Sequence, residues 1–153
     1  MHDDPRFGFD ETYLKEYRPL VAFAQRLGAS PGDAEDAAQE AFLSLHIAWS
    51  RVGNPAGWLR TVVAREVRQS RRTPRRWPLT GAERSRHDAE PDWRDDALDL
   101  LRRLPWPERA AMAWEMDGYS VAETAELTGM TEVEVRRARR RGSAKLKRLI
   151  KEH

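Results

Sequence analysis

The sequence predicts an all-α fold of two small helical domains joined by a flexible linker. Along most of the chain apolar residues recur every three or four positions, as on one face of a helix, and no segment alternates as a strand does. The stretch 73–91 contains three prolines and one glycine and has no helical period, which is typical of a linker. We therefore expect one domain at residues 1–72 and a second at residues 92–153.

Charge and composition limit the classes of protein to which this chain can belong. Residues 1–70 contain eight basic and ten acidic residues, whereas residues 97–153 contain twelve basic and nine acidic residues, so the two domains should have different partners. The chain has no cysteine, which excludes disulfides, cysteine-ligated zinc and thiol catalysis. It has no signal-peptide pattern and no apolar run near the ~20 residues of a membrane helix. We expect a cytoplasmic protein without membrane insertion.

Three helices are predicted in the first domain. The first spans about residues 11–27, and Pro19 should kink or divide it, because proline lacks the N–H that a helix interior needs. The second spans residues 30–51, with Ser30 as its N-cap. The third begins at Pro55 and ends near residue 72.

The second helix has two patterned faces. One is a seam of small or apolar residues: Ala34, Ala38, Ala41 and Leu45. The other mixes polar and aromatic residues: Glu35, Gln39, Phe42, His46 and Trp49. A helix needs only one face to bury itself, so the second face is predicted to bind a partner. A wider contact with the neighbouring helix is the alternative.

The third helix combines an apolar face with exposed arginines and follows an Asn-Pro loop. Asn54 and Trp58 there could present an amide edge and a stacking face next to cations such as Arg65, a combination suited to single-stranded nucleic acid. The alternative is that Asn54 only caps the helix and that Trp58 fills the core.

The second domain ends in a helix-turn-helix pattern. A helix over residues 92–104 and another up to Asp117 come first, separated by a Pro-Trp-Pro break. Two capping boxes then mark helix starts: Ser120 with Glu123, and Thr131 with Glu134. Gly129 lies between them, at the predicted turn, and glycine is the residue type that commonly ends a helix.

The last helix is strongly basic. Of the sixteen residues 136–151, nine are Lys or Arg and none is acidic, so this face should bind phosphates and guanine edges. A merely solvated helix is the alternative, but the capped helix and glycine turn before it favour a DNA-recognition helix.

No catalytic pattern is present. The four histidines are far apart in the sequence, and no paired carboxylates, phosphate-binding glycine loop or metal-ligand spacing occurs. We therefore expect no enzyme activity, no metal and no cofactor.

In this order the motifs resemble those of the extracytoplasmic-function (ECF) sigma factors, the smallest bacterial sigma-70-type initiation factors. Residues 33–42, Asp-Ala-Glu-Asp-Ala-Ala-Gln-Glu-Ala-Phe, are similar to the family string D-A-E-D-x-x-Q-E-x-F. Trp58-Leu59 and Ala64-Arg65 are similar to the W-L and A-R of the helix that melts and reads the −10 element. Leu104-Pro105 and Arg109 resemble L-P-x-x-x-R, and residues 119–146 resemble the −35-reading module. Glu66 and Ser70 stand where the family usually has Asn and Asp.

The resemblance implies an RNA polymerase sigma factor that directs promoter-specific initiation. Residues 1–72 would be a sigma-two-like domain and residues 92–153 a sigma-four-like domain, with core polymerase (β′ clamp helices and β flap) and double- and single-stranded promoter DNA as partners. An anti-sigma factor is left open as a further partner.

The implied contacts to polymerase are Asp36, Gln39, Glu40 and Phe42. The −10 contacts are Asn54, Trp58, Arg60, Arg65 and Arg68, and the −35 contacts are Thr131, Arg136, Arg137, Arg140 and Arg141.

Two other functions remain as alternatives. A free-standing helix-turn-helix regulator would bind its operator alone, usually as a dimer on paired half-sites. A purely protein-binding adaptor would leave the basic helix without a DNA partner.

Overall fold

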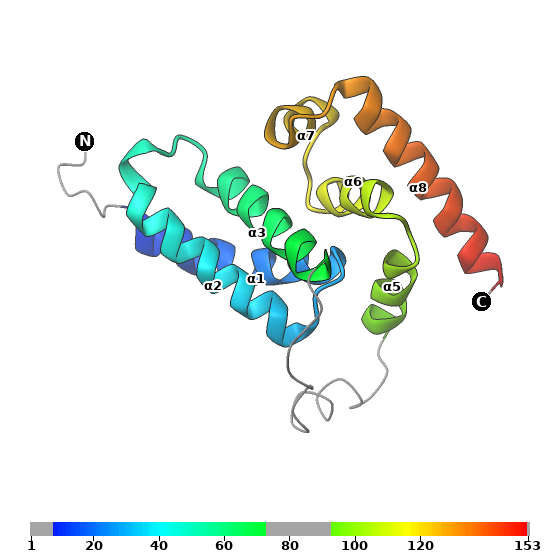
Figure 1. The fold of residues 1–153 in the computed structure, drawn as a ribbon, viewed down its shortest axis with the longest axis horizontal. Helices are drawn as coiled ribbons and strands as arrows, with labels where there is room; N and C mark the ends of the chain where they lie inside the picture. The colour runs from blue at the N-terminus through cyan, green and yellow to red at the C-terminus, as the bar shows by residue number, and fades with distance from the viewer. Residues whose placement is uncertain (1–7, 73–92, 153) are drawn as a thin grey trace.

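The computed structural model describes residues 8–72 and 93–152, and within these ranges all regular structure is helical (Figure 1). The predicted all-α fold is thereby confirmed. The first half comprises α1 (Phe9–Arg26), α2 (Pro31–Ala48), the 3-10 turn η1 (Trp49–Arg51) and α3 (Pro55–Arg72). The second half comprises α5 (Trp93–Arg102), α6 (Trp106–Met116), α7 (Val121–Thr128) and α8 (Glu132–Glu152). The predicted linker, residues 73–91, lies outside the described residues.

α1 continues through Pro19 without interruption, so the expectation that this proline divides the helix is wrong. Leu20, Phe23 and Ala24, which follow it directly, are buried against the other helices. Proline has no backbone N–H and cannot make the helical hydrogen bond at this position. The burial of these three side chains stabilises the helix where that bond is missing. α2 begins as predicted, because the backbone N–H of Asp33 donates to the Ser30 hydroxyl oxygen at 3.2 Å.

The first three helices pack around the small-residue seam of α2. Ala34, Ala38, Ala41 and Leu45 are fully buried, and the short side chains of the three alanines let the neighbouring helices approach closely. α3 adds Leu59, Val63 and Val67 to the same core.

Phe42, on the second predicted face of α2, is also part of the interior. Its side chain is only 4% exposed, and its ring contacts that of Tyr13 on α1 at a centroid distance of 4.8 Å, with Phe9 at 6.3 Å. Phe42 therefore joins α1 to α2 and does not contribute to an exposed surface, which corrects its predicted role as a contact residue. Glu35, Gln39 and His46 of the same face are exposed.

The two halves share one hydrophobic core. Trp114 of α6 is 1% exposed, and its ring lies edge-on to that of Phe23 of α1 at 5.1 Å. Figure 1 shows α6 and α7 beside α1 and α3, while α2 and α8 lie at opposite ends of the molecule. The fold thus leaves these two outer helices available for separate partners.

Candidate functional site

The first helix of the helix-turn-helix starts at the predicted capping box. The Ser120 hydroxyl oxygen accepts a hydrogen bond from the N–H of Glu123 at 3.1 Å, and the Ser120 N–H donates to the Glu123 carboxylate at 2.9 Å. Hydrogen bonds that Ser120 makes to the Glu123 carboxylate, first from its backbone N–H and then from its side chain, lower the pKa of Glu123. Gly129 ends α7 with φ of 79°, a left-handed conformation that glycine adopts at no steric cost.

α8 is capped by Thr131, whose hydroxyl oxygen accepts from the N–H of Glu134 at 3.1 Å. The Glu134 carboxylate accepts from the Thr131 hydroxyl at 3.1 Å. Glu134 thus bonds the hydroxyl of Thr131, whereas Glu123 bonds the backbone N–H of Ser120. Thr131 is exposed at the N-terminus of α8, where a recognition helix meets base edges.

One face of α8 packs against α6. Val135, Ala138 and Gly142 are buried. A Cβ at position 142 would lie 2.9 Å from the Cγ of Met112 on α6, so this close approach requires glycine. α8 is thereby held with its opposite face outward.

The predicted arginines lie on that outward face. Arg136, Arg137, Arg140 and Arg141 are all exposed. Arg136 forms an exposed ion pair with Glu132 one turn earlier, at 3.1 Å. The structure brings these cations together on one side of a helix, an arrangement that suits a DNA groove.

Arg139, which the sequence does not distinguish from its neighbours, has a different role. Its guanidinium donates to the carbonyl of Tyr119 at 2.7 Å and to the hydroxyl of Thr124 at 3.3 Å. It also pairs with Glu115 of α6 at 3.3 Å. Arg139 therefore connects α8 to α6, α7 and the turn between them.

The loop before α3 has a confirmed capping role. The Asn54 side-chain oxygen accepts from the N–H of Gly57 at 3.2 Å. Asn54 is exposed and Trp58 is half-buried. Asn54 thus caps α3, as one alternative held, and Trp58 keeps part of its ring at the surface.

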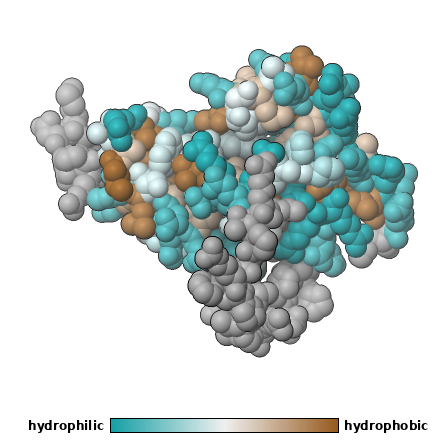
Figure 2. All heavy atoms as spheres, viewed as in Figure 1, coloured by the Kyte–Doolittle hydropathy of each residue, from teal (hydrophilic) through white to brown (hydrophobic). Residues whose placement is uncertain are grey.

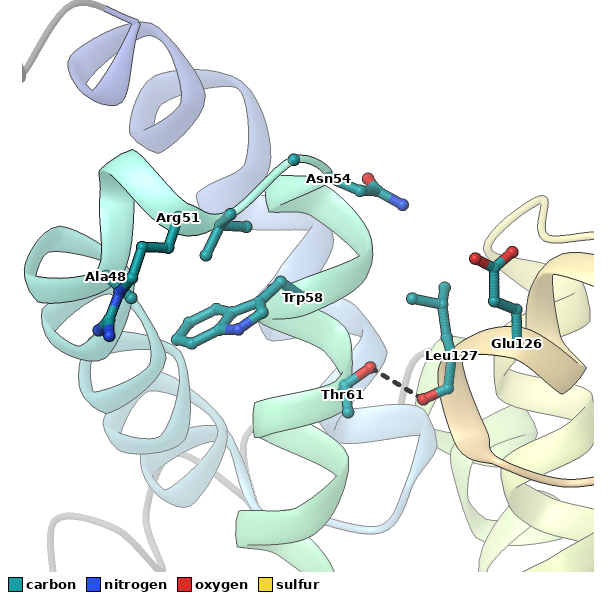
Figure 3. Close-up of a pocket in the computed structure, with 9 residues that line it drawn as sticks. Ala48, Arg51, Asn54, Trp58, Thr61, Glu126 and Leu127 are labelled. Atoms are coloured by element: carbon teal, nitrogen blue, oxygen red, sulfur yellow. Dashed lines mark hydrogen bonds between the residues drawn. The ribbon is translucent and has the colours of Figure 1, made fainter.

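A pocket of about 710 Å³ opens beside Trp58. α3 and its preceding loop line it with Asn54, Trp58 and Thr61, and α7 lines it with Glu126 and Leu127. Figure 3 shows the Trp58 ring on one side of this space and the Leu127 side chain on the other. The two halves of the chain therefore meet at the predicted −10 loop.

Arg60 is buried between the two halves, with 4% exposure. Its guanidinium pairs with Glu16 of α1 at 2.9 Å and with Asp117 of the α6–α7 turn, and it lies 5.6 Å from the centre of the Tyr119 ring. Burial alone would lower the pKa of Arg60, but the hydrogen bonds and charges of these carboxylates outweigh it and raise the pKa. In this arrangement Arg60 is not accessible to DNA, contrary to its predicted role.

The other two predicted −10 arginines remain on the surface. Arg65 and Arg68 are exposed, and Arg68 lies over the Trp106 ring of α6 at 5.7 Å. The −10 residues named from the sequence therefore do not form one accessible surface here.

The outward face of α2 extends further than the sequence motif. Asp36, Gln39 and Glu40 are exposed, and Leu43 and Ile47 continue the same face at 63% and 81% exposure. We call these five residues the α2 stripe. Figure 2 shows apolar surface at the end of the molecule where α2 ends. Helical spacing could have indicated Leu43 and Ile47, but only the packing shows that, among the described helices, none covers them.

Comparison with known proteins assigns the family. Residues 12–77 match the model of sigma-70 region 2, and residues 94–146 match that of sigma-70 region 4. The chain is 30% identical to the ECF RNA polymerase sigma factor SigM of Mycobacterium tuberculosis, over 95% of this chain and 78% of SigM. The chain belongs to the ECF sigma factors. It is 27% identical to the sigma factor CarQ of Myxococcus xanthus, over 99% of this chain and 94% of CarQ.

Two solved structures share the fold of this ECF sigma factor. CnrH, solved in complex with the cytosolic domain of CnrY, superposes with a TM-score of 0.73 at 21% identity, covering 94% of this chain and 88% of CnrH. RpoE of Bartonella quintana, solved with the anti-sigma factor NepR, gives a TM-score of 0.72 at 20% identity, covering 94% and 96%.

The protein is thus an RNA polymerase sigma factor. A free-standing regulator is not favoured, because region 2 accompanies the helix-turn-helix of region 4. Among the described helices, none is both long enough and apolar enough to span a membrane.

Proposed function

We propose that residues 1–72 of this sigma factor bind core polymerase and the −10 element, and that residues 92–153 bind the −35 element. The exposure of the α2 stripe at one end of the molecule and of the α8 arginines at the other supports this division most directly. The two surfaces differ in chemistry: one is acidic and apolar, and the other is cationic. One chain can therefore bind a protein and DNA at the same time.

The α2 stripe is the proposed contact to polymerase, on the β′ clamp helices that the family motif implies. Asp36, Gln39 and Glu40 would supply its polar part, and Leu43 and Ile47 its apolar centre. Burying an exposed aliphatic side chain contributes about 1.5–3 kcal/mol, so these two residues should provide much of the affinity. Region 4 would contact the β flap.

Promoter DNA is proposed to bind at two places. The α8 arginines, with Thr131 at the helix start, would read the −35 duplex from the major groove. Asn54, Trp58, Arg65 and Arg68 would hold the −10 strand, where base stacking contributes about 1–3 kcal/mol per base. The sigma factor itself would make and break no bonds and need no cofactor, because polymerase carries the catalysis.

Two further proposals concern the cellular compartment of the protein and an additional protein partner. It would act in the cytoplasm, where polymerase and promoter DNA are found. An anti-sigma factor is a proposed additional partner, because RpoE was solved with the anti-sigma factor NepR and CnrH with the cytosolic domain of CnrY.

Binding to purified core polymerase tests the α2 stripe. Gln39→Ala with Glu40→Ala, and separately Leu43→Ser with Ile47→Ser, should each weaken binding about tenfold or more, equivalent to at least ~1.4 kcal/mol. Glu11→Ala removes an exposed carboxylate from α1, outside the stripe, and should leave binding unchanged. Unchanged affinity in both double variants would contradict the proposed polymerase contact.

A further inference from the structure

Val133 is an exposed aliphatic residue in the first turn of α8. Its side chain is 57% exposed, and it comes directly after Glu132, the residue at which α8 begins. This turn follows α7 and the Gly129 corner, at the edge of the molecule in Figure 1. Val133 therefore lies at the end of the helix that is proposed to enter the major groove of the −35 element.

Helical geometry places Val133 opposite the buried face of α8. Successive residues are about 100° apart around a helix. Val133 thus lies about 180° from Gly142 and about 160° from Val135, and both of these residues are buried. Arg137 and Arg140 lie within about 40° of Val133 by the same spacing, and both are exposed. Val133 therefore shares the outward, cationic face of the helix.

The polar side chains on either side of Val133 have partners within the helix. The Glu134 carboxylate accepts a hydrogen bond from the Thr131 hydroxyl at 3.1 Å. The Glu132 carboxylate pairs with Arg136 at 3.1 Å. Each carboxylate belongs to a residue about 100° from Val133 around the helix axis. The two γ-methyl groups of Val133 are thus what the first turn presents on its outward face.

The protein itself gains little from valine at this position. Valine has a lower helix propensity than alanine or glutamate, and the first turn of a helix favours acidic side chains. The exposed fraction of Val133 also means that much of its apolar surface stays in water in the free protein. Neither helix formation nor packing favours an aliphatic side chain here, whereas a DNA groove would bury it.

Thymine is the base that an aliphatic side chain recognises in the major groove. Its C5 methyl group is apolar, whereas the other groups on the base edges are hydrogen-bond donors and acceptors. Valine can neither donate nor accept a hydrogen bond, so it would leave such a polar group without a partner. A thymine methyl group packed against valine loses no hydrogen bond and is removed from water.

We propose that Val133 is a specificity-determining residue of region 4, whose side chain packs against the C5 methyl group of a thymine in the −35 element. The inference rests on the proposed binding of α8 to this element. Arg136 and Arg137 follow one turn later on the outward face and contact the neighbouring positions. The −35 element therefore contains a thymine whose methyl group is required for full affinity.

Deoxyuridine tests this contact, because it pairs as thymidine does and lacks only the C5 methyl group. Holoenzyme, assembled from purified core polymerase and the full-length chain, first selects its preferred −35 elements from promoters randomised in that region. Each thymine of the selected element, on either strand, is then replaced in turn by deoxyuridine. The loss of one buried methyl group should weaken promoter binding about fourfold at one position.

Val133→Ser identifies the side chain responsible. In this variant the same replacement should change binding less than about 1.5-fold, because both γ-methyl groups are gone. Ile150→Ser makes a similar change near the other end of α8, at a side chain that is 61% exposed, and should keep the effect seen in the parent. Because Val133→Ser removes no phosphate contact, the slope of log affinity against log salt should equal that of the parent. Circular dichroism verifies that both variants are folded.

Three results would overturn the proposal while leaving −35 binding by α8 intact. They are an equal effect of deoxyuridine in the parent and in Val133→Ser, a parent that tolerates deoxyuridine at every position, and a selected element without thymine. A lower salt slope in Val133→Ser would also contradict it, because a displaced helix would then explain the weaker binding. A parent holoenzyme that selects no −35 element would refute the proposed function, and this inference with it.

Discussion

Arg109 of α6 donates a hydrogen bond of 3.1 Å to the carbonyl oxygen of Leu27, the residue that ends α1 in the other half of the chain. Its other N–H groups donate to three carbonyls at the end of α5: Leu101 at 3.1 Å, Arg102 at 2.7 Å and Leu104 at 2.8 Å. One planar guanidinium thus satisfies the terminal carbonyls of two helices, which lack partners within those helices.

Arg109→Lys should destabilise the protein, because a single ammonium group cannot reach all four carbonyls. Arg109 is 3% exposed, and each buried carbonyl left without a donor costs about 1–3 kcal/mol, so we expect a loss of ~3 kcal/mol or more. Urea unfolding followed by circular dichroism measures it. Arg103→Lys, at an exposed neighbouring position, should change stability by less than about 0.5 kcal/mol, and equal effects of the two substitutions would contradict this role of Arg109.

Arg139→Met should weaken binding of a −35 duplex by about tenfold without removing a DNA contact. The substitution keeps a long side chain but deletes the bonds to Tyr119 and Thr124 that orient α8. Titrations at several salt concentrations identify the cause, since loss of one phosphate contact reduces the slope of log affinity against log salt by about one. The slope should stay constant in Arg139→Met. A reduced slope would show that Arg139 binds DNA directly.

The exposed α8 arginines should divide into two classes when each is changed to alanine. Replacing a base-reading arginine should cost about 1–3 kcal/mol and relax preference at one position of the −35 element, whereas replacing a phosphate-binding one should weaken binding to all sequences. Selection of preferred duplexes from a randomised pool distinguishes the classes for Arg136, Arg137, Arg140 and Arg141. Arg103→Ala is the matched exposed control. Parent-like selection by all four variants would mean that α8 does not read the −35 element.

Asn54→Ser should separate helix capping from base reading. Serine can accept the hydrogen bond from Gly57 that Asn54 now accepts, so the melting temperature should stay close to that of the parent. The amide edge is lost, so we expect a shift in −10 base preference, measured by transcription from a promoter library. Asn54→Ala, which removes both functions, should also lower the melting temperature. Unchanged preference in Asn54→Ser would assign Asn54 to capping alone.

The capping box at Ser120 should make part of the stability depend on pH. The hydrogen bonds from Ser120 lower the pKa of Glu123, so this contribution is present above the pKa of an unfolded glutamate, about 4.3. It is lost as the pH falls through the lower pKa of the folded state. Glu123→Ala should therefore lower the melting temperature at neutral pH, and the difference from the parent should shrink in acid. A difference that stays constant with pH would show that the charge of Glu123 does not contribute.

Local features of this chain could be predicted from the sequence alone. The caps at Ser30 and Ser120 and the turn at Gly129 depend on hydrogen bonds and backbone angles within about four residues, so their residue types are sufficient. The outward arginines of α8 and the polar part of the α2 stripe follow from helical period in the same way. These features also carry most of the family resemblance.

The tertiary structure alone decided which polar groups are available to a partner. Arg60 looks like a surface arginine of α3, but the carboxylate that pairs with it belongs to Asp117, 57 residues later. Phe42 lies on the second face of α2, but it packs against Tyr13, and α1 covers it while leaving Leu43 exposed. Burial depends on which helices pack together, and periodicity within one helix does not specify its neighbours. The closed contact between regions 2 and 4 is for this reason a property of the assembled fold.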